Sequence, residues 1–231
     1  MELTRRHALQ GLAAGSLAGG IGLGTAGTAS AAYPTLKPGM TGPSVKYLQV
    51  YLAKAGYWLG AADGVYGMLT TQAVYAIQGA CGLTRDGICG PTTWSRVMAG
   101  ARPPVASRSG KWIEIDKGRS LLKVVLNGRL YLTVHTCTGS GQTYYSNGSY
   151  HTAVTPSGQF RVFRQVSGWD SGPLGALYAP KYFNGGIAIH GYPSVPAYPA
   201  SHGCARVSLQ AMNLFWGTKY PIQVGTNVWV Y

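Results

Sequence analysis

The segment SHGCARVS, residues 201–208, places one cysteine among residues that favour nucleophilic chemistry. Cys204 follows His202 by two positions and precedes Arg206 by two, and a second histidine, His190, ends the apolar run GGIAIHG. A thiol attacks a carbonyl group as the thiolate, so it needs a lowered pKa and a neighbouring base. The three prolines between His190 and Cys204 limit the conformations of that segment. We expect it to fold back and to bring the imidazole and the thiol together, with His202 also within reach.

Two further features of the segment suit acyl transfer. Gly203 has no side chain to cover nearby backbone N–H groups, so the amides around Cys204 are candidate donors to an oxyanion. The guanidinium of Arg206 would stabilise a thiolate or bind a substrate carboxylate through two hydrogen bonds. One cysteine with two histidines at no fixed spacing is weak evidence for a metal site. We therefore expect neither a metal nor a cofactor.

The cysteines also have a structural interpretation. There are four, at positions 81, 89, 137 and 204, and they allow three complete pairings. An oxidising compartment favours disulfides, and Cys81 and Cys89 are close neighbours in CGLTRDGICG, so we expect these two to pair. A disulfide between Cys137 and Cys204 would silence the nucleophile and is the minor alternative.

Residues 1–32 indicate an export signal. The twin arginines Arg5 and Arg6 precede a Gly- and Ala-rich apolar run, and the small residues 29–31 offer an A-x-A cleavage site. The arginine pair resembles a twin-arginine address. We expect this signal to be cleaved and the protein to act at the cell wall or outside the cell; an uncleaved membrane helix is the alternative.

The charge of the chain is strongly positive, with a formal net charge of +13. After residue 100, twelve Lys and Arg residues stand against three acidic ones. Such an excess favours attraction to a polyanion. For an exported protein the anionic wall polymers are candidate partners, and the absence of a basic cluster or nucleic-acid motif argues against nucleic acid. Alternatively, the charge only keeps the protein soluble.

The elements that would position this site fall into two regions, and the first predicts three short helices. Helical periodicity over residues 44–55 begins at Ser44, a candidate N-cap, and stops at Gly56. The pattern D-G-x-x-G-x-x-T then occurs twice, at residues 63–70 and 86–93, and a helix is expected after each copy. Asp-Gly predicts a turn with positive φ, the second glycine a close backbone approach, and the threonine a helix N-cap.

This region resembles the peptidoglycan-binding domain of wall-lytic and wall-modifying enzymes. The resemblance rests on LKPGMTGPSVKYLQ and on both copies of the Asp-Gly pattern, and it covers residues 33–99 almost completely. It implies a small all-α domain of three helices that holds peptidoglycan in a shallow groove. A helical domain without affinity for the polymer is the alternative.

The second region predicts a mainly β domain over residues 111–231, after a linker rich in Pro, Ser and Arg at residues 100–110. Alternating β-branched residues predict strands within 111–118, 120–128, 129–139, 158–166 and 226–231. Asn127-Gly128 predicts a hairpin turn. One helix is expected after Ser208, its N-cap, ending at Gly217.

The motifs I-H-G at 189–191 and S-H-G-C-x-R-V-S at 201–208 resemble the L,D-transpeptidase catalytic family, the YkuD-type domain, and the resemblance extends over residues 112–231. It implies a sandwich-like β fold with a capping loop, Cys204 as nucleophile, His190 as general base, and the carbonyl of Gly191 as the group that orients the imidazole. The other signature positions are matched by Ser201, His202, Gly203 and Arg206. Ala205 and Cys137 depart from the family pattern, in which a larger aliphatic residue and a serine are usual.

The two resemblances together imply a secreted peptidoglycan L,D-transpeptidase. The donor would be a tetrapeptide stem, the intermediate a thioester on Cys204, and the acceptor a diamino acid on a neighbouring stem, which gives a 3→3 cross-link. The same site implies covalent inhibition by β-lactams of the carbapenem type. If water replaces the acceptor amine, the enzyme is an L,D-carboxypeptidase; a degenerate site would leave a non-catalytic wall-binding protein.

Overall fold

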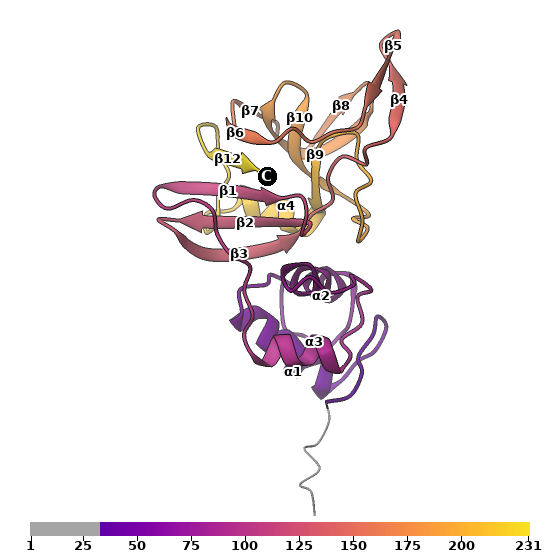
Figure 1. Ribbon diagram of the computed structural model, residues 1–231, viewed down its shortest axis with the longest axis vertical. Helices are drawn as coiled ribbons and strands as arrows, with labels where there is room; N and C mark the ends of the chain where they lie inside the picture. Colours follow the sequence, from indigo (N-terminus) through magenta and orange to yellow (C-terminus); the bar gives the residue numbers. More distant parts are fainter. Residues whose placement is uncertain (1–32) are drawn as a thin grey trace, which may run out of the picture. The chain divides into compact units, whose positions relative to one another are not determined.

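Two five-stranded β-sheets dominate the computed structural model, which describes residues 33–231 (Figure 1). The expected export signal lies outside the described residues. The first sheet has the order β3-β2-β1-β12-β6. Its strands are β1 (Lys111–Asp116), β2 (Leu121–Leu126), β3 (Arg129–His135), β6 (Gly158–Arg161) and β12 (Asn227–Val230).

The second sheet has the order β11-β10-β9-β7, with β8 paired to β9 as well. Its strands are β7 (Arg164–Gln165), β8 (Trp169–Gly172), β9 (Gly175–Asn184), β10 (Ile187–Tyr192) and β11 (Ala205–Ser208). A separate hairpin of β4 (Thr143–Ser146) and β5 (Ser149–Thr152) extends away from both sheets (Figure 1).

A single apolar core joins the two sheets and the helix α4 (Leu209–Trp216). Fully buried side chains come from each of them, for example Ile113 and Val228 from the first sheet, Ile189 from the second and Phe215 from α4. This arrangement confirms the sandwich-like β domain.

Two local predictions for the β domain are confirmed. Asn127 and Gly128 both have positive φ, 49° and 74°, as the turn between β2 and β3 requires. The Ser208 hydroxyl accepts a hydrogen bond from the Ala211 amide and caps α4, which ends at Gly217.

The strand pattern also differs from prediction. Strand β10 does not end at His190 but continues to Tyr192. The hairpin β4–β5 was not predicted, because its strands are short and polar and every residue of β5 is exposed. Such strands bury no apolar face, so they lack the alternation on which prediction depends.

Three helices form the N-terminal part, as predicted: α1 (Pro43–Lys54), α2 (Met68–Ala80) and α3 (Pro91–Met98). Their core includes Leu48, Leu52, Ile77 and Trp94, all buried. The expected N-caps are wrong. The capping positions are the glycines that precede each helix, and no side chain caps α1, α2 or α3.

The repeated Asp-Gly pattern builds two turns, each closed by a buried glutamine. Gln49 Nε2 donates to Asp63 Oδ1 at 2.8 Å and to Thr70 Oγ1 at 2.9 Å, and the Gly64 amide donates back to Gln49 Oε1 at 2.8 Å. Gln78 makes the equivalent contacts in the second copy. The threonines are therefore acceptors for glutamine and not caps.

The two glycine types in this pattern behave differently. Gly64 and Gly87 have positive φ, 81° and 72°, which confirms the predicted turns. The close backbone approach expected at the second glycine is wrong, because a Cβ built on Gly67 or Gly90 would meet nothing within 4 Å.

All four cysteines are free thiols. The expected Cys81–Cys89 disulfide is therefore not formed: Cys89 is buried in the helical core, whereas Cys81 follows the end of α2 and is partly exposed. Cys137 is also buried, and its backbone pairs with the backbone of Arg206. Its sulfur forms no disulfide with Cys204.

The segment after α3 is held against the β domain by a buried carboxylate. Glu114 accepts hydrogen bonds from the amides of Ala106 and Ser107 and forms an ion pair of 2.9 Å with Lys123. Both charged side chains are fully buried. The proline- and serine-rich stretch expected to act as a linker is thus pinned by side-chain contacts along part of its length.

Residues 33–231 form one compact unit. The helical part contacts the first sheet through reciprocal backbone hydrogen bonds around Thr133, whose carbonyl accepts from Trp58 and whose amide donates to Gly56. Within this described range, none of the helices has both the length and the apolar character needed to cross a membrane.

Candidate active site

His190 on β10 and Cys204, which directly precedes β11, line one cavity. The pairing of β10 with β11 sets His190 opposite Arg206. Residues paired in register project from the same face of a sheet, so His190 and Arg206 do so, and Cys204 lies immediately before β11. All three line a cavity of about 1040 Å³. The predicted convergence of these residues is therefore present in the structure.

The imidazole of His190 is held by the next residue in the chain. Its Nδ1 donates to the carbonyl oxygen of Gly191 at 2.9 Å, which leaves Nε2 as the nitrogen able to accept a proton. Burial, against the opposing effect of the hydrogen bond to the Gly191 carbonyl and with a smaller contribution from the charge of Arg206, lowers the pKa of His190 to about 4. The ring is therefore a neutral base at neutral pH.

Gly191 leaves no room for a side chain at this point. A Cβ there would lie 2.8 Å from the Tyr178 ring and 3.1 Å from Met212. The glycine in the I-H-G motif thus allows β10 to pack closely against β9 and α4 while its carbonyl orients His190.

The thiol of Cys204 is protonated in the free protein. Burial raises its pKa, although the Ala188 amide, which donates to Sγ at 3.4 Å, and the charge of Arg206 both lower it. This result corrects the expectation of a lowered pKa: removal of the sulfur from water outweighs its two favourable neighbours. The thiol and the imidazole are both neutral, so an attack by this thiol would require transfer of its proton to a base such as His190.

Ser201 shapes the turn that presents the cysteine. Its hydroxyl is buried, accepts from the Gly203 amide at 3.0 Å and donates to the Cys204 carbonyl at 2.6 Å. Gly203 has a φ of +148°, and a Cβ on it would meet the Val154 carbonyl at 2.9 Å. The Gly203 amide is already bonded, whereas we find no acceptor for the Cys204 amide among the described residues.

His202 and Arg206 lie at the edge of the same cavity. His202 is exposed and packs edge-on against Tyr144, with ring centres 4.7 Å apart. The Arg206 guanidinium lies over the Tyr192 ring and donates to the Ala200 carbonyl at 3.1 Å. Its Nε is buried and has no hydrogen-bond partner among the described residues.

Three further residues line this cavity, and the sequence does not predict them. Arg164 and Tyr182 both donate to Oδ2 of Asp170, at 2.9 Å and 2.8 Å. They come from β7, β8 and β9, and no motif or spacing in the sequence relates them. Only the pairing of β9 with both β7 and β8 brings them together.

The segment between His190 and Cys204 is supported from both parts of the chain. The backbone carbonyls of Val195, Pro196 and Ala197 each accept one side-chain hydrogen bond. The donors are Gln72 at 2.8 Å, His135 at 2.7 Å and Arg85 at 2.7 Å, respectively. Gln72 and Arg85 belong to the helical part, so this part supports the active-site segment directly.

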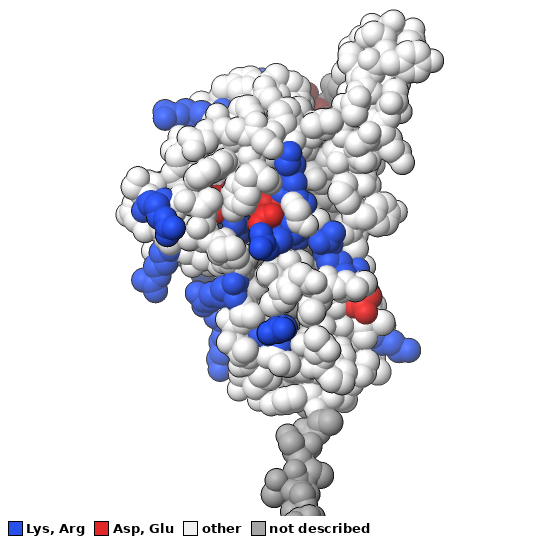
Figure 2. Space-filling model, in the orientation of Figure 1, with Lys and Arg blue, Asp and Glu red and all other residues white. Residues whose placement is uncertain are grey.

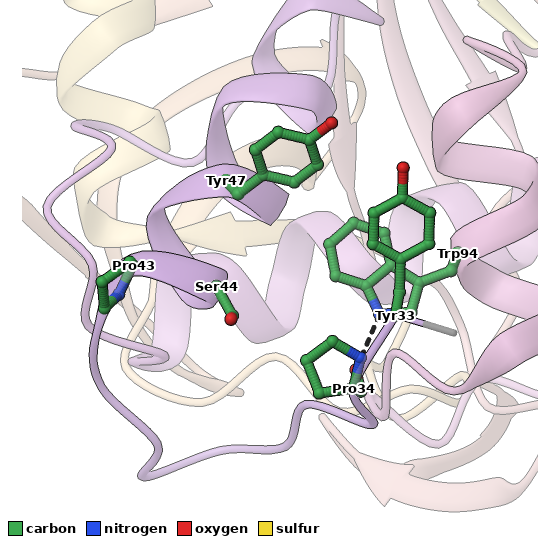
Figure 3. Close-up of a pocket in the computed structure, with 6 residues that line it drawn as sticks. All are labelled: Tyr33, Pro34, Pro43, Ser44, Tyr47 and Trp94. Atoms are coloured by element: carbon green, nitrogen blue, oxygen red, sulfur yellow. Dashed lines mark hydrogen bonds between the residues drawn. The ribbon is translucent and has the colours of Figure 1, made fainter. Parts of the chain in front are cut away.

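A second, smaller cavity of about 320 Å³ lies on the helical part (Figure 3). Tyr33 stacks on Trp94 with ring centres 4.7 Å apart, and Tyr47 lies beside them. The Trp94 indole donates to the Pro34 carbonyl at 2.8 Å, drawn as the dashed line. Tyr33 and Tyr47 are each about 40% exposed, at 41% and 39%, and so offer aromatic surface to a ligand.

Basic side chains predominate on the face that Figure 2 shows, where Lys and Arg greatly outnumber acidic groups. The hairpin β4–β5 contains no charged residue.

Comparison with known proteins identifies the two parts. Residues 41–97 match the family model described as "Putative peptidoglycan binding domain", and residues 110–230 match the L,D-transpeptidase catalytic domain, YkuD. The chain belongs to the L,D-transpeptidase family. A solved L,D-transpeptidase from Xylanimonas cellulosilytica, residues 123–326, is 46% identical with a TM-score of 0.83, over 86% of this chain and 97% of that one.

Curated relatives share a smaller part of the chain. A Bacillus licheniformis protein named "Probable N-acetylmuramoyl-L-alanine amidase" is 31% identical over 132 residues, 56% of this chain. The chain spans only 37% of the length of that relative. A second Bacillus licheniformis protein, N-acetylmuramoyl-L-alanine amidase CwlL, is 44% identical over 79 residues, 33% of this chain and 22% of its own length.

Proposed function

We propose that the protein is an exported peptidoglycan L,D-transpeptidase that forms 3→3 cross-links through a thioester on Cys204. The observation that supports this most directly is the convergence of two neutral groups, the Cys204 thiol and the His190 imidazole, on one cavity. The hydrogen bond from His190 to Gly191 gives the imidazole the tautomer that a general base needs. Membership of the transpeptidase family supports the reaction class.

In the acylation step, Cys204 Sγ attacks the carbonyl between the third residue of a tetrapeptide stem and its terminal D-alanine. His190 Nε2 takes the thiol proton as the C–S bond forms, and it delivers this proton to the departing amine of D-alanine. The Cys204 amide, which has no acceptor among the described residues, is the candidate donor to the oxyanion. The products are a thioester and free D-alanine.

In the second step, the side-chain amine of a diamino acid on a neighbouring stem attacks the thioester. His190 accepts a proton from that amine and returns one to the sulfur, so the free thiol is regenerated and an amide bond joins the two stems. Arg206 lines the same cavity, which supports a role for its guanidinium in holding a substrate carboxylate.

We assign wall attachment to the helical part. Aromatic faces such as those of Tyr33 and Tyr47 offer stacking surface for the pyranose rings of a glycan, and the small cavity beside them suits part of one ring. Attachment would raise the local concentration of stems at the catalytic cavity without a change in the chemistry. The net positive charge makes anionic wall polymers additional candidate partners.

The test is to incubate the mature protein with a carbapenem and to weigh the intact adduct, and then to analyse products from tetrapeptide stems. We expect one covalent adduct on Cys204 and a cross-linked dimer when an acceptor is present. Cys204→Ala should lose both while it still sediments with purified wall. Release of tripeptide without dimer would instead assign an L,D-carboxypeptidase, and an unchanged stem profile with intact wall binding would assign a non-catalytic protein.

A further inference from the structure

The active-site cavity contains one carboxylate among the residues that the structure describes, that of Asp170. The β domain has two other acidic residues, Glu114 and Asp116, and both are buried away from solvent. In a chain with a formal net charge of +13, the single solvent-accessible acidic side chain of this domain thus lines the same cavity as Cys204. This position calls for a functional explanation.

The two oxygens of Asp170 have different environments. Oδ2 accepts from Arg164 at 2.9 Å and from the Tyr182 hydroxyl at 2.8 Å. Oδ1 has no partner among the described residues, and the side chain is 21% exposed. An ionised carboxylate accepts on both oxygens, so Oδ1 is oriented by the bonds on Oδ2 and remains free for a donor in the cavity.

Tyr182 donates to this carboxylate and lines the same cavity as Cys204. Burial, the hydrogen bond to Asp170 and the charges of Asp170 and of a Cys204 thiolate raise the pKa of Tyr182 to about 12. Asp170, Tyr182 and Cys204 share one cavity, so a side chain whose own carbonyl lies at the sulfur can extend toward Asp170 within it.

We propose that Asp170 Oδ1 binds the side-chain ammonium of the donor stem's third residue, a diamino acid. This proposal rests on the proposed function, because it is the carbonyl of that third residue that Cys204 attacks. The long aliphatic arm of a diamino acid then extends from the sulfur across the cavity and places its ammonium at the carboxylate. Asp170 is thus a specificity residue for the donor.

The ammonium of the acceptor stem has the same chemistry but is the weaker candidate. An acceptor amine must be neutral to attack the thioester, and a carboxylate stabilises the protonated form. A carboxylate at the acceptor position would therefore slow the second step. The donor ammonium does not react, so its protonated form can be bound throughout the cycle.

The size of the effect follows from two opposing interactions. A hydrogen bond between charged groups contributes about tenfold or more in affinity. Arg164, whose side chain is 53% exposed, carries a positive charge beside the same carboxylate and reduces the attraction, although solvent screens this repulsion. We expect a net preference of about tenfold for a donor that carries the ammonium.

The experiment compares matched donors. Tetrapeptide stems with lysine or meso-diaminopimelate at position three are tested first, and the one that supports D-alanine release is compared with its deaminated analogue, which has norleucine or 2-aminopimelate. For the wild-type protein, KM should be about tenfold lower for the charged donor, with a smaller change in kcat. This difference should shrink at high ionic strength.

Three variants define the outcome. Asp170→Asn should raise KM for the charged donor to the value for the neutral one, and Asp170→Glu should restore part of the difference. Arg161→Gln alters an exposed charge on β6 outside the cavity and should keep the full difference.

Three results would overturn the proposal. They are equal KM values for charged and neutral donors in the wild-type protein, a preference that survives in Asp170→Asn, or an Asp170→Asn effect confined to the KM of the acceptor. In each case D-alanine release would still support the proposed function. That function would fail separately, if no donor released D-alanine and no carbapenem adduct formed on Cys204.

Discussion

The Nδ1 atom of His190 donates a 2.9 Å hydrogen bond to the carbonyl oxygen of Gly191, the next residue of the same strand. A backbone carbonyl can only accept, so the neutral imidazole carries its proton on Nδ1. The second ring nitrogen, Nε2, is then left with its lone pair free for the thiol. A contact between adjacent residues in a strand thus decides which nitrogen can accept a proton.

This geometry predicts an unusual acid limit for activity. Burial lowers the pKa of His190 to about 4, so the ring stays neutral as the pH falls from 7 to 5. We expect the second-order rate of carbapenem acylation to hold over that range and to fall only near pH 4, where the imidazole becomes protonated. The measurement is a pH–rate profile from adduct mass. A midpoint near 6.5, the ordinary pKa of histidine, would contradict it.

The basic limit of the same profile depends on the thiol. Burial raises the pKa of Cys204 above its ordinary value of 9.0. The rate should therefore stay level through pH 8 and show no step between pH 6 and 8. His190→Asn should reduce the rate at all these pH values, because it removes the base without a large change in volume.

The support of residues 195–197 predicts that the helical part affects catalysis as well as attachment. Gln72→Ala with Arg85→Ala removes two of the three side-chain donors to that segment. We expect the acylation rate of the double variant to fall by about tenfold, because misplaced catalytic groups lose orientation. Wall binding should be retained. Lys46→Ala, an exposed change in α1, is the matched control.

Equal acylation rates for the double variant and the wild-type protein would show that the segment is held without these donors. A matched loss of thermal stability and rate would also contradict the prediction, because it would assign the effect to folding. The His135 contact, made from β3 to the Pro196 carbonyl, remains in the double variant and limits the expected loss.

The sequence predicted those parts of the site that lie close together in the chain. The imidazole and the thiol were related by short motifs, and the strand before His190 was visible as an apolar run. The residues that the structure adds, Arg164, Asp170 and Tyr182, are separated by irregular segments. Their approach depends on the register of β9 with two partners, which no local pattern encodes.

The errors in the helical part have a similar origin. Thr70 and Thr93 occupy positions that suit an N-cap by local rules. The structure instead uses them as acceptors for Gln49 and Gln78, whose amide groups are buried and must be satisfied. Both copies of the Asp-Gly pattern form the predicted turns, but the role of their threonines depends on two glutamines that lie outside the repeated pattern.

The buried ion pair of Lys123 and Glu114 predicts a large effect on stability. Lys123→Met leaves the Glu114 carboxylate buried without its cation, and we expect a loss of about 3–5 kcal/mol in the free energy of unfolding. The double variant Lys123→Met, Glu114→Gln should lose less, because it removes the unpaired charge. Urea denaturation measures both. A double variant as unstable as the single one would contradict this account.

The same carboxylate predicts a loss of stability in acid. Burial alone would raise the pKa of Glu114, but hydrogen bonds from Ser107, Lys123 and Ala106 lower it below the ordinary 4.5. A lowered pKa in the folded state means that the group stabilises the fold fully above pH 4.5, and that this contribution is lost as the pH falls. In Glu114→Gln this pH-dependent term should be absent from urea unfolding curves between pH 5 and 3.

The aromatic cavity on the helical part predicts where the wall polymer is held. Tyr47→Ala removes an exposed ring that lies beside Tyr33 and Trp94, and Trp94 itself stays buried in the core. We expect the dissociation constant for purified wall to rise by about five- to tenfold, the loss of one aromatic contact of about 1 kcal/mol or slightly more. Tyr131→Ala, which removes a comparably exposed tyrosine from β3, should bind as the wild type does.

Carbapenem acylation of Cys204 should be the same in both variants, because neither residue lines the catalytic cavity. If Tyr47→Ala and Tyr131→Ala bind the wall equally well, the aromatic cavity is not the attachment site, and the basic surface becomes the better candidate.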